Sequence, residues 1–135
     1  MSLSIIIPCR NEQKVIGETI NIILKYITNK VDEFEIIIIN DFSTDNTLEE
    51  LNKLAKTNIK IKVYVNTTIG LGGAITLGIQ KAIYKFSVIV MADLSDSPED
   101  ILKYYTEIKN NDYDAVLGTR FGPHSKILDY PKRKL

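Results

Sequence analysis

Five short runs of isoleucine, valine and other β-forming residues most constrain what this chain can fold into. They lack the polar alternation of strands that face water on one side, so both of their faces are expected to be covered. Segments with helical spacing separate the runs. Alternating strands and helices predict an α/β fold with a doubly wound, mainly parallel sheet and helices on both faces. The expected strands are SIIIP at 4–8, EIIIIND at 35–41, IKVYVN at 61–66, SVIVMAD at 87–93 and DAVLGT at 114–119.

Capping residues and apolar stripes locate the helices between these strands. Ser97 as a cap, Pro98 at the first helical position and two acids in the first turn predict a helix start. Ser43, Thr44 or Asp45 can cap the second helix. The first helix is indicated by an apolar stripe with a period near 3.6, formed by Val15, Ile16, Ile20, Ile23, Leu24 and Ile27.

Length and composition predict one cytoplasmic domain. The chain has 135 residues, 44% of them hydrophobic, so we expect a single domain with its core in 4–120 and an irregular segment at 121–135. Basic and acidic residues balance at 17 each, which argues against a nucleic acid partner. No apolar run approaches the roughly 20 residues of a membrane helix, and no secretory leader opens the chain. A single cysteine, Cys9, suits a reducing compartment.

Polar residues and glycines gather after the expected strands. In an open parallel sheet, ligands bind at the carboxyl ends of the strands, so these residues are the candidates for function. The groups are Pro8 to Glu12, Asn40 to Asp45, Asn66 to Gly73, Asp93 to Asp96 and Gly118 to Arg120.

Asp93 is the candidate metal ligand. It ends an apolar run, with Ser95 and Asp96 in reach of the same ion directly or through water. A divalent cation held by carboxylate is a common way to neutralise a departing diphosphate. Asp93 and Asp96 could instead cap the next helix, but Ser97 is the better cap, which favours the metal interpretation.

The other strand ends permit both functional and structural interpretations. Asp41 can accept hydrogen bonds from a base or ribose. Glu12 can contact a ligand, or it can be an acid in the first helical turn, where the helix dipole favours negative charge. Arg10 can bind a phosphate or base, or it can be a solvated surface charge. The stretch Gly70 to Gly73 opens a helix, so its backbone N–H groups can approach a ligand. It follows the third strand and precedes no lysine, which excludes a dinucleotide fingerprint and the phosphate loop of ATPases.

The ordered set PCRNE, NDFSTDNT, GLGGAITLG, MADLSDSPEDI and GTRF resembles family 2 of the GT-A fold glycosyltransferases. ADLSDSPEDI with VLGTRF is most similar to the polyprenyl-phosphate sugar transferases, such as dolichol-phosphate mannose synthases. The resemblance covers about residues 4–121. Each motif is loose alone, but five in the right order and spacing are specific. The resemblance implies a Rossmann-like nucleotide-diphospho-sugar-binding fold, with an acceptor-binding part beyond residue 135.

The resemblance also implies roles for individual residues. Pro8 and Glu12 match the motif that holds the nucleobase, Asp41 matches the acid that contacts base or ribose, and Arg120 matches a basic residue thought to meet phosphate of donor or acceptor. The implied nucleotide-sugar-binding residues are Pro8, Cys9, Arg10, Glu12, Asp41, Gly70, Gly72, Ala92 and Asp93.

Asp93 also matches the metal-binding acid of the family's DxD motif. Met91 stands where the first acid of that motif is usual. Binding of Mg²⁺ or Mn²⁺ would therefore rest on Asp93 with Ser95 or Asp96.

The implied activity is a single in-line transfer, with inversion, from a UDP- or GDP-linked sugar. The expected acceptor is a polyprenyl phosphate, met at the inner face of a membrane through peripheral contact. No catalytic base is recognisable in the sequence. An acceptor phosphate that is already ionised would need none, which is one explanation. The other is that the base lies beyond residue 135. The oligomeric state is open, because an incomplete domain can pair with a second copy.

Four alternatives stay open. One is a polysaccharide or glycan-chain transferase of the same family, which would use a carboxylate base. Another is a donor-binding fragment without turnover. The third is a non-catalytic nucleotide-binding module. The fourth is a sugar-phosphate nucleotidyltransferase, although the glycine-rich basic loop expected after its first strand is missing from PCRNE.

Overall fold

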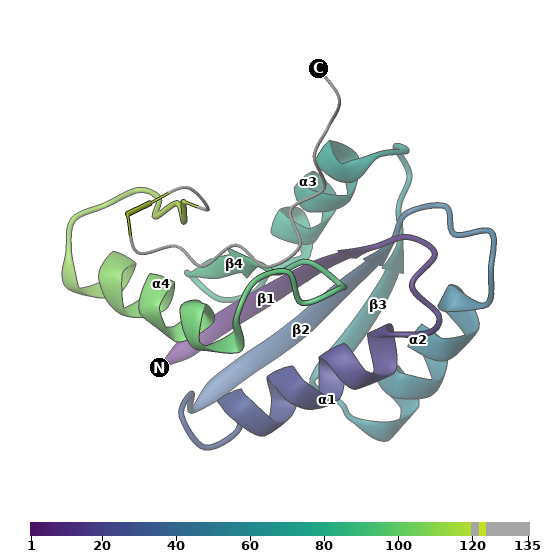
Figure 1. The fold of residues 1–135 in the computed structure, drawn as a ribbon, viewed down its shortest axis with the longest axis horizontal. Coiled ribbons are helices and arrows are strands. Elements are labelled where there is room, and N and C mark those ends of the chain that lie inside the picture. Colours follow the sequence, from purple (N-terminus) through teal and green to yellow (C-terminus); the bar gives the residue numbers. More distant parts are fainter. Residues whose placement is uncertain (120–121, 124–135) are drawn as a thin grey trace.

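Strands and helices alternate along the computed structural model, which describes residues 1–119 and 122–123. All strand pairings are parallel, and the strand order is β3-β2-β1-β4. The predicted α/β architecture is confirmed (Figure 1). The elements are β1 (Ser2–Cys9), α1 (Ile16–Ile27), β2 (Glu33–Asn40), α2 (Thr47–Thr57), β3 (Ile61–Val65), α3 (Leu71–Lys81), β4 (Ser87–Ile89) and α4 (Pro98–Asn110).

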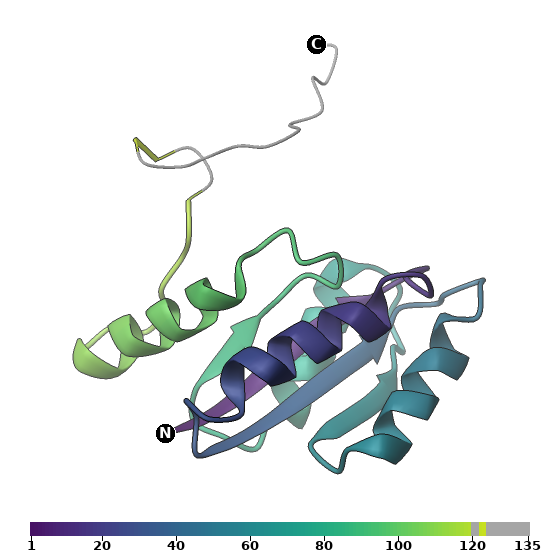
Figure 2. The same cartoon turned by 60° about the horizontal axis from the view of Figure 1, so that its bottom comes forward.

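Helices cover both faces of the sheet, as predicted, but unequally. Helices α1, α2 and α4 lie on one face and α3 lies on the other (Figures 1 and 2). Successive strand residues point to opposite faces, so the isoleucine run of β2 supplies both cores. Ile36 and Ile38 join the larger core, while Ile37 and Ile39 pack with Ala74 of α3. This explains why the run has no polar alternation.

The predicted cap of α4 is present, and at α2 the predicted Asp45 lies one residue before the cap residue Asn46. The Ser97 hydroxyl accepts a hydrogen bond from the backbone N–H of Glu99, and Pro98 begins α4. Asp45 accepts the backbone N–H of Thr47, the first residue of α2, at 2.9 Å. These helices are short, and in the part of the chain that the structure describes none combines the length and apolar character needed to cross a membrane.

The strand order places a topological switch beside β1. From β1 the chain proceeds outward to β2 and β3, and then returns to the other side of β1 as β4. Neighbouring crossovers therefore leave in opposite directions, which opens a crevice at the carboxyl ends of the strands. Cys9 is in register with Asn40, and Ile6 with Ile89. The segments that follow β1, β2 and β4 consequently emerge at the same edge.

The predicted fifth strand at 114–119 is wrong. Residues 114–119 form no strand, and Leu117 is 91% exposed. A strand requires a hydrogen-bonded neighbour, and the sheet of the described residues ends at β4, which pairs over only Ser87–Ile89. Because β4 pairs over so few residues, it offers few backbone groups with which a further strand could form hydrogen bonds. Of the expected irregular segment 121–135, all but residues 122–123 lies outside the described residues.

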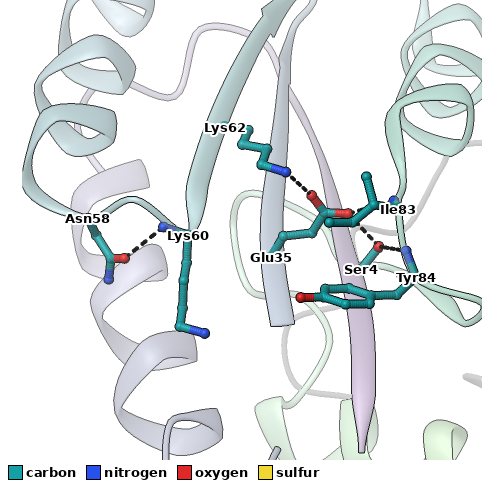
Figure 3. Close-up of polar contacts among 7 residues, drawn as sticks. All are labelled: Ser4, Glu35, Asn58, Lys60, Lys62, Ile83 and Tyr84. Atoms are coloured by element: carbon teal, nitrogen blue, oxygen red, sulfur yellow. Dashed lines mark hydrogen bonds and ion pairs between the residues drawn. The ribbon is translucent and has the colours of Figure 1, made fainter. Parts of the chain in front are cut away.

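A buried polar network closes the opposite, amino-terminal edge of the sheet. The Glu35 carboxylate accepts hydrogen bonds from the Ser4 hydroxyl at 2.7 Å, the Ile83 backbone N–H at 2.8 Å and the Lys62 ammonium at 2.7 Å (Figure 3). Burial raises the pKa of Glu35, but these hydrogen bonds outweigh it and hold the pKa below its ordinary value. The network ties three strands to the segment after α3.

Candidate functional site

A cleft of about 340 Å³ lies at the carboxyl ends of β1, β2 and β4, beside the start of α3. Every nucleotide-sugar-binding residue expected from the sequence lines it, except Gly72. Leu71 and Met91 also line it and were not among the expected binding residues. Leu71 lies within the glycine stretch expected to approach a ligand, and Met91 stands at the usual place of the first acid of the DxD motif. The lining residues are Pro8, Cys9, Arg10, Glu12, Asp41, Gly70, Leu71, Met91, Ala92 and Asp93.

Of the expected metal-binding residues, only Asp93 lines the cleft. Asp93 is exposed and lines the cleft, whereas Ser95 and Asp96 are not among its lining residues. The Ser95 backbone N–H instead donates to Asp93 Oδ1 at 3.0 Å, which orients that carboxylate. Within residues 1–119 and 122–123, no three His, Cys, Asp or Glu side chains group closely enough to hold a metal ion by themselves. Arg120 lies outside the described residues.

Asp41 holds the loop between β3 and α3 against the cleft. Asp41 is 6% exposed, and its Oδ1 accepts hydrogen bonds from Asn66 Nδ2 at 2.8 Å and the Gly70 backbone N–H at 2.9 Å. Asn66 also donates to the Thr68 carbonyl oxygen at 2.6 Å. Gly70 has a φ of +110°, in a region that favours glycine. The Gly70 N–H is thus engaged by Asp41, a structural role for this acid that sequence reasoning did not predict.

Gly73 allows this loop to approach α3 closely. A Cβ at Gly73 would lie 2.0 Å from the Thr68 carbonyl oxygen, whereas a Cβ at Gly72 would meet nothing within 4 Å. Gly73→Ala is therefore expected to displace the loop and lower the free energy of unfolding by about 1–3 kcal/mol. Gly72→Ala is the matched control, expected to leave stability unchanged or raise it by roughly 0.5–1 kcal/mol. Urea unfolding of both variants measures the difference, and equal stabilities would contradict the close approach.

The loop after β1 is held by the loop after β2. The Asn11 backbone N–H donates to Ser43 Oγ at 3.0 Å, and Asn11 Oδ1 accepts the Thr44 backbone N–H at 2.7 Å. The Glu12 backbone N–H donates to Thr47 Oγ1 at 2.9 Å. Ser43 and Thr44 are thus used for this contact, and of the three predicted capping residues Asp45 is the one that bonds to the first turn of α2. The contact fixes the backbone on both sides of Asn11, so the neighbouring cleft residues have defined positions.

The electrostatics of the cleft are dominated by acids. Burial raises the pKa of Glu12, and the negative charges of Asp93 and Asp45 raise it further. Burial, followed by the charges of Glu12 and Asp45, raises the pKa of Cys9 to about 12. Cys9 is therefore a protonated thiol that packs in the core rather than a nucleophile. The effect of the Asp93 charge on the pKa of Glu12 marks the region of the cleft where a cation would be favoured.

Asp93 suits a cation that also binds a ligand. In the described residues, Asp93 Oδ1 carries the hydrogen bond from Ser95 and no hydrogen bond is formed by Oδ2. Mg²⁺ is usually bound by one or two carboxylates, with substrate phosphates and water completing its octahedron, and Mn²⁺ also accepts oxygen ligands of this kind. A single exposed carboxylate beside an open cleft fits such a shared site and does not fit a site built by protein alone.

Comparison with known proteins gives consistent findings. Residues 4–135 match the family model described as glycosyl transferase family 2. The chain is 31% identical to the dolichol-phosphate mannosyltransferase of Pyrococcus furiosus, over 97% of this chain and 36% of the relative. It is 32% identical to the poly-beta-1,6-N-acetyl-D-glucosamine synthase of Staphylococcus aureus, over 89% of this chain and 28% of the relative.

The structure is similar to that of S. aureus TarS in complex with UDP. The TM-score is 0.62 and the sequence identity 28%, with 79% of this chain and 32% of that chain covered. The chain spans between 22% and 36% of the length of the first curated relatives it matches.

Proposed function

Because the chain belongs to glycosyl transferase family 2, we propose that its cleft binds a nucleotide-diphosphate sugar and that the chain is the donor-binding part of an inverting transferase. The observation that carries the proposal is the convergence of Glu12, Asp41 and Asp93, from three separate strand ends, on one cleft at the topological switch. The UDP in the TarS complex supports a nucleoside diphosphate as the ligand class.

The proposed donor orientation follows from the lining residues. The nucleoside would lie between the β1 end, at Pro8 and Cys9, and Asp41. Among the described residues, Asp41 Oδ2 accepts just one hydrogen bond, from the Gly70 backbone N–H at 3.2 Å. The diphosphate would then extend towards Asp93. Arg10 is exposed at the same rim and would offset phosphate charge. This orientation keeps the negative diphosphate apart from the buried carboxylate of Asp41.

We propose that Asp93 holds Mg²⁺ or Mn²⁺ jointly with the diphosphate. When bound, the cation supplies charge stabilisation for the departing nucleoside diphosphate. Asp93 contributes the protein ligand, and Ser95 keeps that carboxylate oriented through its backbone N–H. Asp96, half-buried and outside the lining of the cleft, is the weaker candidate for the same role.

In the proposed reaction, an acceptor oxygen attacks the anomeric carbon while the bond from that carbon to the diphosphate oxygen breaks. One displacement of this kind inverts the configuration. The chain's own residues bind and orient the donor for this step, and the catalytic base is unassigned. Arg120, proposed to meet phosphate of donor or acceptor, stays a prediction.

A polyprenyl phosphate is the acceptor we propose first. The mannosyltransferase of P. furiosus, whose name specifies a dolichol-phosphate acceptor, matches nearly the whole of this chain. An ionised phosphate acceptor also needs no general base. A growing glycan is the second candidate, favoured by the equally similar poly-beta-1,6-N-acetyl-D-glucosamine synthase. A glycan hydroxyl would require a base, for which this chain offers no assigned residue.

Thermal unfolding with ligands tests donor binding. UDP-N-acetylglucosamine or GDP-mannose is expected to raise the Tm of the chain in Mn²⁺ or Mg²⁺ and to leave it unchanged in EDTA. A ligand at 100 times its Kd adds about 2.7 kcal/mol to the unfolding free energy. ATP with Mn²⁺ controls for triphosphate–metal effects, and a larger shift with ATP would favour a nucleotidyltransferase. No shift with any nucleotide sugar and metal would overturn the proposal.

A further inference from the structure

Thr19 connects α1 to the loop that carries Asp93. The Thr19 side chain is buried, with the residue 3% exposed, and its Oγ1 donates a hydrogen bond to the Ala92 carbonyl oxygen at 2.7 Å. Ala92 is also 3% exposed, lines the cleft and directly precedes Asp93. The contact joins residues 73 positions apart, through an element that sequence reasoning treated only as an apolar stripe.

The other hydrogen bonds of this loop are local. The Leu94 backbone N–H donates to the Met91 carbonyl oxygen at 3.1 Å, and the Ser95 N–H donates to Asp93 Oδ1 at 3.0 Å. Leu94 has a φ of +52°, so the loop turns sharply after Asp93. Among the described residues, the bond from Thr19 is the one hydrogen bond that ties residues 91–95 to another element. The local bonds shape the turn, whereas the Thr19 bond, together with the core packing of Ala92 and Leu94, holds the turn against α1.

We propose that Thr19 is a positioning residue, whose hydroxyl sets the place of the Asp93 carboxylate for a divalent cation and a nucleoside diphosphate. The inference rests on the proposed function and extends it to a residue that does not line the cleft. A threonine suits this task because its β-branched side chain has restricted rotamers in a helix, and its hydroxyl supplies the one donor required.

The test separates the effect of the Thr19 hydroxyl from the effect of the size of the side chain. Thr19→Val keeps the shape and removes the donor, whereas Thr19→Ser keeps the donor. Mn²⁺ affinity is measured from the electron paramagnetic resonance of free Mn²⁺, with UDP present in excess. Thr19→Val is expected to weaken Mn²⁺ binding by at least about tenfold, the lower limit for partners that orient metal ligands. Thr19→Ser is expected to restore the affinity to within about twofold.

A matched control separates positioning from general loss of stability. Ser4→Ala removes another buried hydroxyl, at the opposite edge of the sheet, where Ser4 bonds to Glu35. It is expected to lower Tm without changing Mn²⁺ affinity. If Thr19→Val does not fold, Thr19→Cys replaces it, since a thiol is similar in size and a weak donor.

The outcomes distinguish this inference from the proposed function. If the wild-type chain binds no Mn²⁺ in the presence of UDP or GDP, the proposed function fails and the inference fails with it. If the wild type binds and the variant without a hydroxyl donor binds equally well, only the role of Thr19 is overturned. A weakened Thr19→Ser would likewise overturn it, because the hydroxyl would then not be the group that positions Asp93.

Discussion

Asp93→Asn is expected to abolish the metal-dependent rise in Tm caused by a nucleotide sugar, while leaving the fold intact. The side chain is exposed, and asparagine keeps an oxygen that can accept the Ser95 backbone N–H. What is lost is the negative charge that a hard cation requires from its protein ligand. Replacing a partner that only orients a metal ligand costs about 10–100-fold in affinity, so loss of the ligand itself should exceed about 100-fold.

The measurement is Tm with UDP-N-acetylglucosamine or GDP-mannose in Mn²⁺ and in EDTA, for the variant and the wild type. Asp96→Asn is the comparison, because Asp96 is the neighbouring acid that does not line the cleft. It is expected to retain most of the metal-dependent shift. A full shift in Asp93→Asn, or a larger loss in Asp96→Asn, would show that the cation is held elsewhere.

The place of the site could be predicted because it depends on periodicity and chain order. Unbroken apolar runs indicate strands covered on both faces, and the alternation with helices requires them to be parallel. Parallel strands bring their carboxyl ends to one edge, so Glu12, Asp41 and Asp93 could be expected together before any coordinates were known. The structure brings all three to the same cleft.

The pairings of individual side chains could not be predicted in the same way. Asp41 with Gly70, and Thr19 with Ala92, join residues 29 and 73 positions apart. Such contacts depend on the packing of helices on the sheet, for which a single sequence carries no periodic signal. The prediction of a fifth strand was wrong for a related reason. Residues 114–119 have a strand-forming composition, but in the described residues they have no strand to pair with.

The network at the amino-terminal edge of the sheet predicts the largest loss of stability. Glu35 is 2% exposed, and Lys62 supplies the positive charge that pairs with it. Lys62→Met keeps the aliphatic stem but leaves a buried carboxylate without its counter-ion. Breaking a buried pair costs about 3–5 kcal/mol. Because the Lys62 side chain is 35% exposed and water can approach the pair, we expect about 2–3 kcal/mol at neutral pH.

The same network predicts the sign of a pH dependence. In the wild type, hydrogen bonds hold the pKa of Glu35 below its ordinary value of 4.5, so this stabilisation is present above that pH and is lost as pH falls through the lower, folded-state pKa. Without Lys62, one of the interactions that lower the pKa of Glu35 is lost while the effect of burial remains, so the pKa of Glu35 rises. The variant then recovers relative stability when the carboxyl is protonated. The difference in unfolding free energy between wild type and Lys62→Met should therefore shrink as the pH falls from neutral, through the raised pKa of the variant, to the lower pKa of Glu35 in the wild type.

Urea unfolding between about pH 7 and about pH 3, a range that spans the titration of carboxyl groups, measures both effects. Lys53→Met is the matched control, since the Lys53 side chain is 59% exposed and its ion pairs with Glu49 and Glu50 lie on the surface of α2. Its removal should change stability little, because exposed pairs are screened by water and salt. If Lys62→Met lost no more stability than Lys53→Met, or if its deficit were the same at every pH, Glu35 would be held by Ser4 and Ile83 alone, and the charge of Lys62 would not contribute.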